Sequence, residues 1–245
     1  MDYNSKKLAY QKLIEQVRED YRTPPGGLEW CEDCKEINLW TYWQGRENLD
    51  ARIILVGQDW GCTRGADATA VMSNIRSMNA GKPVPYMLGN ENPTDQNLIT
   101  LFREIGYEIN SPTSSNQALF FTNFVLGYRD KCSSGGFQKS WAKHDAPYFA
   151  TLATIIQPEY ILCLGRDTFE SVLMAFQESP STPIRSYNRF IESDRNPVTI
   201  SLLNQRPMRV FALAHCGKLG TMNRNRGQEN KLSLQCQIND WHKIR

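Results

Sequence analysis

The sequence predicts an α/β protein: a three-layer α/β/α sandwich around a four-stranded parallel sheet. Four short apolar runs support this prediction, because each is bounded by turn residues and is too short for a buried helix. Segments with helical periodicity or helix-capping residues separate the runs, and strands that alternate with helices form parallel sheets. No internal repeat is present. We therefore expect one domain over residues 1–245, with an N-terminal helix and a C-x-x-C loop within residues 1–50.

Each expected strand ends in glycine or polar residues, a pattern typical of strands buried in a parallel sheet. The runs lie at residues 52–56, 118–125, 160–164 and 209–214. Pro158 precedes the third run and Gly165 follows it, which defines the bounds of that strand. The carboxyl ends of parallel strands meet at one edge of a sheet, where open α/β sheets bind ligands.

Helical periodicity and capping residues identify the segments between the strands. Apolar side chains recur on one face among the charges of residues 5–20, and Thr94-Asp95-Gln96-Asn97 supplies capping side chains for the next helix. The expected helices span residues 5–20, 94–105, 140–157, 168–177 and 229–244. We expect residues 61–93 to form a long surface loop with a short helix near residues 70–78. We expect residues 178–208 to form an irregular connection.

Composition and charge exclude several classes of protein. Hydrophobic residues make up 40% of the chain and charged residues 22%, as in soluble globular proteins. No apolar run is long enough to span a membrane, and the N-terminus lacks an apolar signal core, so we expect a cytoplasmic protein without a membrane partner. The net charge of +2 excludes a uniformly basic surface. Lys218, Arg224 and Arg226 nevertheless form a local basic cluster with no acidic residue between them.

The chain has 7 cysteines and no export signal, which argues against a disulfide framework. Cys31 and Cys34 form a C-x-x-C, a spacing that suits metal binding or redox chemistry. The other cysteines are isolated in sequence.

Polar residues follow the ends of three separate strands: Asp59, Asn123 and His215. A carboxylate can orient water and stabilise a cationic sugar, an amide matches the edge of a nucleobase, and an imidazole can donate to a leaving group. On position alone, Asp59 is either a catalytic carboxylate or a helix N-cap, and caps are the commoner case. Asn123 bonded to backbone and His215 as an ordinary buried histidine are the corresponding structural alternatives.

The order of these motifs resembles that of the uracil-DNA glycosylase superfamily, over roughly residues 28–243. Gly57-Gln58-Asp59-Trp60-Gly61 resembles the family's water-activating motif, and Phe121-Thr122-Asn123-Phe124-Val125 resembles the strand whose Asn binds the base. Residues 158–166 are similar to the Pro…Leu-Gly-Arg strand of the iron–sulfur branches. His215-Cys216-Gly217-Lys218-Leu219 occupies the place of the motif whose His contacts the base and whose Leu enters the duplex.

The resemblance implies a monofunctional DNA glycosylase that acts on a nucleotide flipped out of double-stranded DNA. It assigns water positioning to Asp59 and stabilisation of the departing base to His215. It implies no cofactor for the chemistry and a monomeric protein. The remaining assignments are base binding by Gln58, Gly61, Tyr86 and Asn123, filling of the vacated space by Leu219, and phosphate binding by Lys218, Arg224 and Arg226.

Departures from the family pattern bear on the substrate. Gly61 stands where the uracil-specific branch has a Tyr that blocks the 5-position of the base, and Trp60 replaces a Pro. Our hypothesis is a 5-substituted pyrimidine, such as the hydroxymethylated or glucosylated cytosine of phage DNA, which would make the protein an antiviral defence enzyme. Other branches also carry Gly here, and the Asn123 amide suits uracil or cytosine. Uracil excision in base excision repair and a non-catalytic nucleic-acid-binding module are therefore the alternatives.

A metal site is also implied by the resemblance. The iron–sulfur branches carry a C-x-x-C ahead of the first strand, which Cys31 and Cys34 match. Their third cysteine follows the Asn strand, where the nearest candidate is Cys132, and their fourth falls beside His144. The implied ligands are therefore three thiolates and one imidazole. Structural zinc favours this mixture, and an iron–sulfur cluster, which usually takes four thiolates, is the alternative.

Overall fold

The central element of the computed structural model is a mainly parallel sheet with the strand order β3-β2-β5-β7-β6. The structure describes residues 1–29, 48–59, 93–109, 119–129, 136–179, 183–203 and 205–244. The strands are β2 (Ile53–Gly57), β3 (Leu119–Asn123), β5 (Tyr160–Leu164), β6 (Val198–Ile200) and β7 (Met208–Leu213). Strands β2, β3, β5 and β7 run parallel, whereas β6 pairs antiparallel with β7 at the edge. The α/β class is confirmed, but the described sheet has five strands rather than four.

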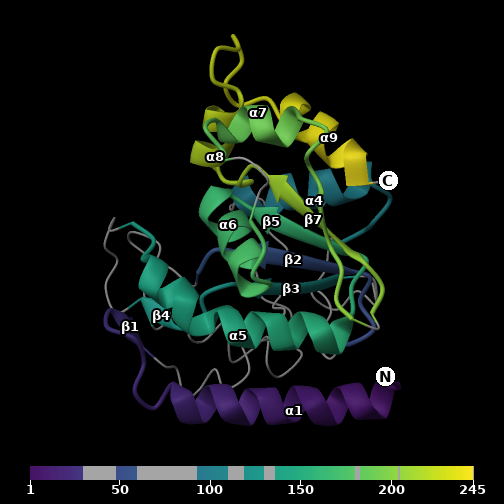
Figure 1. Ribbon diagram of the computed structural model, residues 1–245. Coiled ribbons are helices and arrows are strands. Elements are labelled where there is room, and N and C mark those ends of the chain that lie inside the picture. The colour runs from purple at the N-terminus through teal and green to yellow at the C-terminus, as the bar shows by residue number, and fades with distance from the viewer. Residues whose placement is uncertain are drawn as a thin grey trace.

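Helices cover both faces of this sheet and give the expected three layers (Figure 1). One face carries α5 (Lys139–Ile156) and α6 (Arg166–Ala175), with α1 (Tyr3–Asp20) packed outside α5. The other face carries α4 (Pro93–Glu104) and α9 (Gln235–Trp241). The remaining described elements are α7 (Tyr187–Glu192), α8 (Lys218–Arg224), a 3-10 turn (His242–Ile244) and the antiparallel pair of β1 (Leu28–Glu29) and β4 (Tyr128–Arg129).

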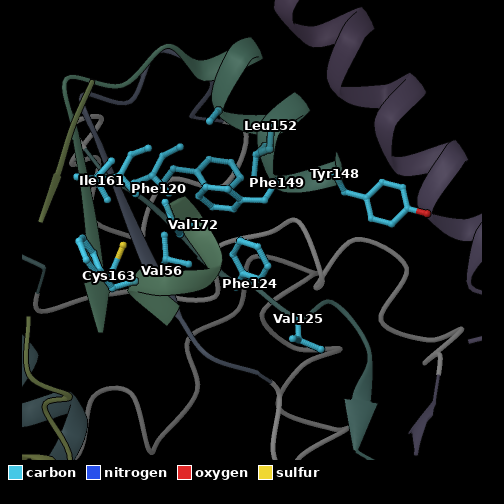
Figure 2. Packing of buried hydrophobic residues seen from close by; sticks show 14 of the residues in the cluster. Val56, Phe120, Phe124, Val125, Tyr148, Phe149, Leu152, Ile161, Cys163 and Val172 are labelled. Carbon is cyan, nitrogen blue, oxygen red and sulfur yellow. The ribbon is translucent and has the colours of Figure 1, made fainter. Parts of the chain in front are cut away.

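Alternate residues of each strand enter two separate apolar cores. Ile53 and Leu55 pack with α4 and α9 on one face, whereas Val56 faces the helices on the other. Figure 2 shows Val56 and Phe120 in the same cluster of buried side chains as Phe149 of α5. Because both faces are covered, every residue of β2 is buried, which explains why the strand appears in the sequence as a continuous apolar run.

The largest departure from the sequence-based expectation is in residues 178–208. They hold α7 and β6 instead of an irregular connection. The Asn196 amide donates to the Ile191 and Ala212 carbonyls and accepts from the Ala212 N–H, so it supplies bonds beside β7 that a strand would otherwise make. Such bonds between distant residues leave no periodic signal in the sequence.

The C-terminal helices also differ from expectation. Helix α8 was not expected, and the final helix begins at Gln235 rather than near residue 229. The short helix expected near residues 70–78 lies outside the described residues. The surface loop expected over residues 61–93, except for its last residue, and the C-x-x-C loop also lie outside the described residues, and the other expected helices and strands match the observed ones closely. None of the described helices is long and apolar enough to cross a membrane.

A buried carboxyl group in the first turn of α4 should make the stability of the protein depend on pH. Asp95 is 2% exposed, and its Oδ2 has no hydrogen-bond donor among the described residues. Burial raises the pKa of this carboxyl group from 3.8 to about 7. The folded protein thus keeps a proton that the unfolded chain releases, so the group lowers the free energy of unfolding as the pH rises from about 4 to 7.

We expect Asp95→Asn to remove about 2–3 kcal/mol of the decline in unfolding free energy between roughly pH 5 and pH 8. Urea unfolding of both proteins at the two pH values measures this difference. Asn is the matched replacement because it keeps the shape of the side chain and cannot ionise. The same pH dependence in both proteins would contradict the assignment.

Candidate active site at the carboxyl edge of the sheet

The ends of β2 and β3 bring the segment that carries Asp59 close to Asn123. Gly57, the last residue of β2, pairs with Asn123, the last residue of β3. The two chains remain bonded beyond this pair, because Phe124 N donates to Gly57 O at 2.9 Å and Val125 N donates to Gln58 O at 3.0 Å. The residues that follow β2 therefore leave the sheet directly beside Asn123.

Glycine at position 57 leaves room for the Asn123 side chain, which occupies the space that a Cβ atom would take. A Cβ atom at Gly57 would overlap Asn123 Oδ1. Asn123 is 6% exposed, so close packing limits the orientations of its amide. An amide held in this way can present a fixed donor and acceptor pattern to a ligand.

Asp59 follows β2 and interacts electrostatically with His215, which follows β7. Gln58 Nε2 donates a hydrogen bond to Asp59 Oδ2 at 3.0 Å. The Asp59 carboxylate favours the protonated imidazole, yet burial among protein atoms has the larger effect and lowers the pKa of His215. The structure therefore brings a carboxylate and a neutral imidazole together at this edge, even though the His215 side chain keeps exposed surface.

A hydrogen bond from the backbone selects one form of the His215 ring. Gly217 N donates to His215 Nδ1 at 2.9 Å, so this nitrogen acts as an acceptor. An imidazolium carries a proton on both nitrogens and cannot accept this bond. The neutral ring with its proton on Nε2 is thus favoured, and Nε2–H can donate to a ligand.

The loop that carries His215 is held by side chains from two helices. Asn97 of α4 donates to the Cys216 carbonyl at 2.7 Å, and Gln237 of α9 donates to the His215 carbonyl at 3.3 Å. A Cβ atom at Gly220 would overlap the His215 carbonyl, so α8 can begin here only with a glycine at that position. Asn97 and Gln237 were not expected from the sequence, and no short motif links them to residue 215.

A second network fixes the loop after Asn123. The buried Asp145 carboxylate accepts from Leu126 N and from the Tyr21 hydroxyl, both at 2.6 Å. The Tyr21 hydroxyl in turn accepts from Gly127 N at 3.0 Å. These bonds attach the loop to α5 and to the end of α1. Asp145 was not among the expected site residues, because a single Asp within a helix has no distinctive sequence signal.

His144, the imidazole of the expected metal site, is bonded to a buried carboxylate. Its Nδ1 bonds the Asp145 carboxylate at 2.6 Å, and this bond raises the pKa of His144. Metal-binding histidines commonly hold a carboxylate through one ring nitrogen and the metal through the other, so His144 fits the expected role. Cys31, Cys34 and Cys132 lie outside the described residues. No group of three or more potential ligands occurs among the residues that are described.

The residues expected to contact DNA are divided between surface and interior. Lys218 and Leu219 begin α8 and are exposed, Leu219 to 75%, and Arg226 is exposed beyond the end of this helix. The expectation that Arg224 binds a phosphate is wrong. It is buried and donates two hydrogen bonds to Asp240, at 2.7 and 2.9 Å, and its Nη1 lies 2.9 Å from Glu192. This arginine joins α8 to α7 and α9 and is not available to a phosphate.

Three residues expected near the base lie outside the described part of the chain: Trp60, Gly61 and Tyr86. A cavity of about 570 Å³ opens at the opposite, amino-terminal edge of the sheet. Four of its five charged residues form ion pairs within the protein, Lys6 with Asp50 and Arg52 with Glu159. Lys6 similarly donates to the carbonyls of Leu49 and Ile156 and to Asp50. We therefore place the candidate site at the carboxyl edge.

Comparison with models of protein families gives no match to this chain, and comparison with curated proteins gives none either. The functional argument therefore rests on the residues and geometry of the site.

The state of His215 can be measured directly, because the chain has only 3 histidines. We expect its imidazole to titrate below 6.5 and to carry its proton on Nε2 at neutral pH. Long-range ¹H–¹⁵N NMR spectra recorded against pH report both properties, and His215→Asn identifies the resonances. A proton on Nδ1, or titration above the ordinary range of histidine, would contradict the geometry.

The close packing of Gly57 against Asn123 predicts the effect of a single methyl group. We expect Gly57→Ala to displace the Asn123 amide and to weaken ligand binding by about 10-fold or more, since a misplaced amide loses its hydrogen bonds. Gly26→Ala is the control, because a Cβ atom there has no neighbour within 4 Å. Titration of the wild type and both variants with duplex DNA, the ligand expected from the sequence, measures the effect. Equal affinity of the two variants would show that Asn123 does not need this contact.

Proposed function

We propose that this protein is a monofunctional DNA glycosylase that hydrolyses the N-glycosidic bond of a flipped pyrimidine and leaves an abasic site. One observation carries the proposal. Asn123 ends β3, Asp59 and His215 follow β2 and β7 at the same edge of the sheet, and Asp59 interacts electrostatically with a neutral His215. In this reaction a negative group can stabilise the cationic sugar, an amide can bind the edge of the base, and a neutral donor can stabilise the departing base.

The proposed reaction divides charge between sugar and base. As the bond from C1′ to the base nitrogen breaks, its electron pair passes to the base and the sugar becomes cationic. The Asp59 carboxylate stabilises this cation and orients a water molecule, whose oxygen bonds to C1′ while its proton is released. His215 Nε2–H donates a hydrogen bond to the base as negative charge develops there. The base then takes up a proton, so no cofactor enters the chemistry.

The substrate that we propose is a 5-substituted cytosine, hydroxymethylated or glucosylated, in phage DNA. Gly61 in place of a blocking Tyr supports an open 5-position, and this support comes from the sequence alone. The Asn123 amide suits cytosine as well as uracil. Uracil excision in repair is therefore the alternative that shares the same site, whereas a role in antiviral defence follows from the modified base.

DNA binding fits the surface beside His215. Leu219 is 75% exposed although it is large and apolar, and it begins α8 together with the exposed Lys218. An apolar side chain in such a position can fill the space that a flipped nucleotide leaves in the duplex. Lys218 and Arg226 would then bind the flanking phosphates.

We also propose a structural zinc ion bound by Cys31, Cys34, Cys132 and His144, with an iron–sulfur cluster as the alternative. The bond from His144 Nδ1 to Asp145 supports a ligand role for the other ring nitrogen. Such a metal would bind three cysteines from other parts of the chain to His144 of α5, and it would take no part in the reaction.

Metal analysis of protein purified without oxygen tests this site. We expect about one equivalent of zinc per chain in the wild type and a clear loss in His144→Ala. His242→Ala is the control, since this exposed histidine faces Glu104 on another part of the surface. A wild-type protein without bound metal would overturn the proposal.

Release of free bases from a panel of DNAs, detected by mass spectrometry, tests the proposed reaction. The panel contains uracil, thymine, cytosine, hydroxymethylcytosine and glucosylated hydroxymethylcytosine. We expect release of the modified cytosine by the wild type and a loss of roughly 10²–10⁴-fold in rate for Asp59→Ala, because the carboxylate acts in the transition state.

Circular dichroism of both proteins controls for folding in this comparison. Equal release by wild type and Asp59→Ala would contradict the mechanism. Efficient release of uracil with modified DNA left intact would overturn the substrate and support repair. DNA binding by the wild type without release of any base would favour the non-catalytic module.

A further inference from the structure

The segment before α7 lies along the same sheet edge as the candidate site. Arg166 Nη2, which follows β5, donates to the Ile184 carbonyl at 2.9 Å. The Tyr187 hydroxyl donates to the carbonyl of Leu213, the last residue of β7, at 3.1 Å. His215 follows Leu213 closely in the chain. The start of α7 is therefore fixed beside the ends of β5 and β7.

Helix α7 also meets α8, the helix that follows His215. Asn188 Nδ2 donates to the Asn223 carbonyl at 2.9 Å, and Arg226 Nη2 donates to Asn223 Oδ1 at 3.4 Å. An ion pair of 2.9 Å between Glu192 and the buried Arg224 links the same two helices. Figure 1 shows α7 and α8 together at the end of the molecule away from α1.

Basic side chains are exposed on both of these connected segments. Arg185 and Arg189 come from the start and the middle of the α7 segment, and Lys218 and Arg226 flank α8. Neither Arg185 nor Arg189 has an ion pair with a described residue. Glu192, the acid within α7, is already paired with Arg224. The α7 and α8 segments therefore expose four basic side chains, while Glu192 is held in an ion pair with Arg224.

We propose that Arg185 and Arg189 form one DNA-backbone contact surface together with Lys218 and Arg226. This inference rests on the proposed function and extends it to residues of the 183–192 segment. Guanidinium groups on a fixed support bind phosphate oxygens through paired hydrogen bonds. The bonds to Leu213 and Asn223 hold α7 in a fixed position beside the loop of His215. Phosphates bound along α7 would thus be aligned with the nucleotide presented to the site.

Fluorescence anisotropy with a labelled duplex that contains a tetrahydrofuran abasic site tests the surface. The test variant is Arg185→Ala/Arg189→Ala. The control is Lys7→Ala/Lys12→Ala, which removes the same charge from exposed positions on α1. We expect the slope of log Kd against log salt to fall by about 2 in the arginine variant, with affinity weakened about 10-fold or more at moderate salt. The lysine variant should keep the wild-type slope.

The outcomes separate this inference from the proposed function. If the wild type releases base and binds the duplex, and the arginine variant keeps the wild-type slope and affinity, only the α7 surface is overturned. An equal loss in both double variants would also overturn it, since the effect would then reflect total charge. If the wild type binds no DNA under any salt condition, the proposed function fails, and the inference fails with it.

Discussion

The parallel pairing of β2 with β3 is the constraint on which the candidate site depends. The register places Gly57 opposite Asn123, and backbone bonds continue past this pair to Gln58 and Val125. Because both faces of β2 are buried, a shift of one residue would move its apolar side chains to the wrong cores. The same shift would separate the Asp59 loop from the Asn123 amide, so core packing and site geometry are set by one register.

The electrostatics of the site follow from burial and from one backbone bond. Burial lowers the pKa of His215 against the pull of Asp59, and Gly217 N–H requires an acceptor at Nδ1. Together these effects favour a single negative charge, on the Asp59 carboxylate, beside a neutral donor. A protonated His215 would neutralise that carboxylate and weaken its attraction for a cationic sugar. In the proposed reaction, a neutral ring would keep the role of His215 separate from that of Asp59.

The sequence could predict features that local pattern determines. Continuous apolar runs identified β2, β3, β5 and β7, and the rule that parallel strands end at one edge grouped Asp59, Asn123 and His215. Features that depend on distant partners could not be predicted this way. Arg224 was expected to bind a phosphate, but it is buried and paired with Asp240. The short strand β6 likewise depends on tertiary bonds near the sheet edge.

The central claim is that Asp59 stabilises positive charge on the sugar of a flipped nucleotide. Its most direct test compares the affinity of the protein for a duplex with a cationic pyrrolidine in place of the sugar and for a duplex with the neutral tetrahydrofuran analogue. Transition-state analogues bind more tightly than their neutral counterparts when a site stabilises the charge they carry. The predicted result is a preference of at least about 10²-fold for the cationic duplex, which Asp59→Asn abolishes. Equal affinity for the two duplexes in the wild type, or a preference that Asp59→Asn retains, would contradict the claim.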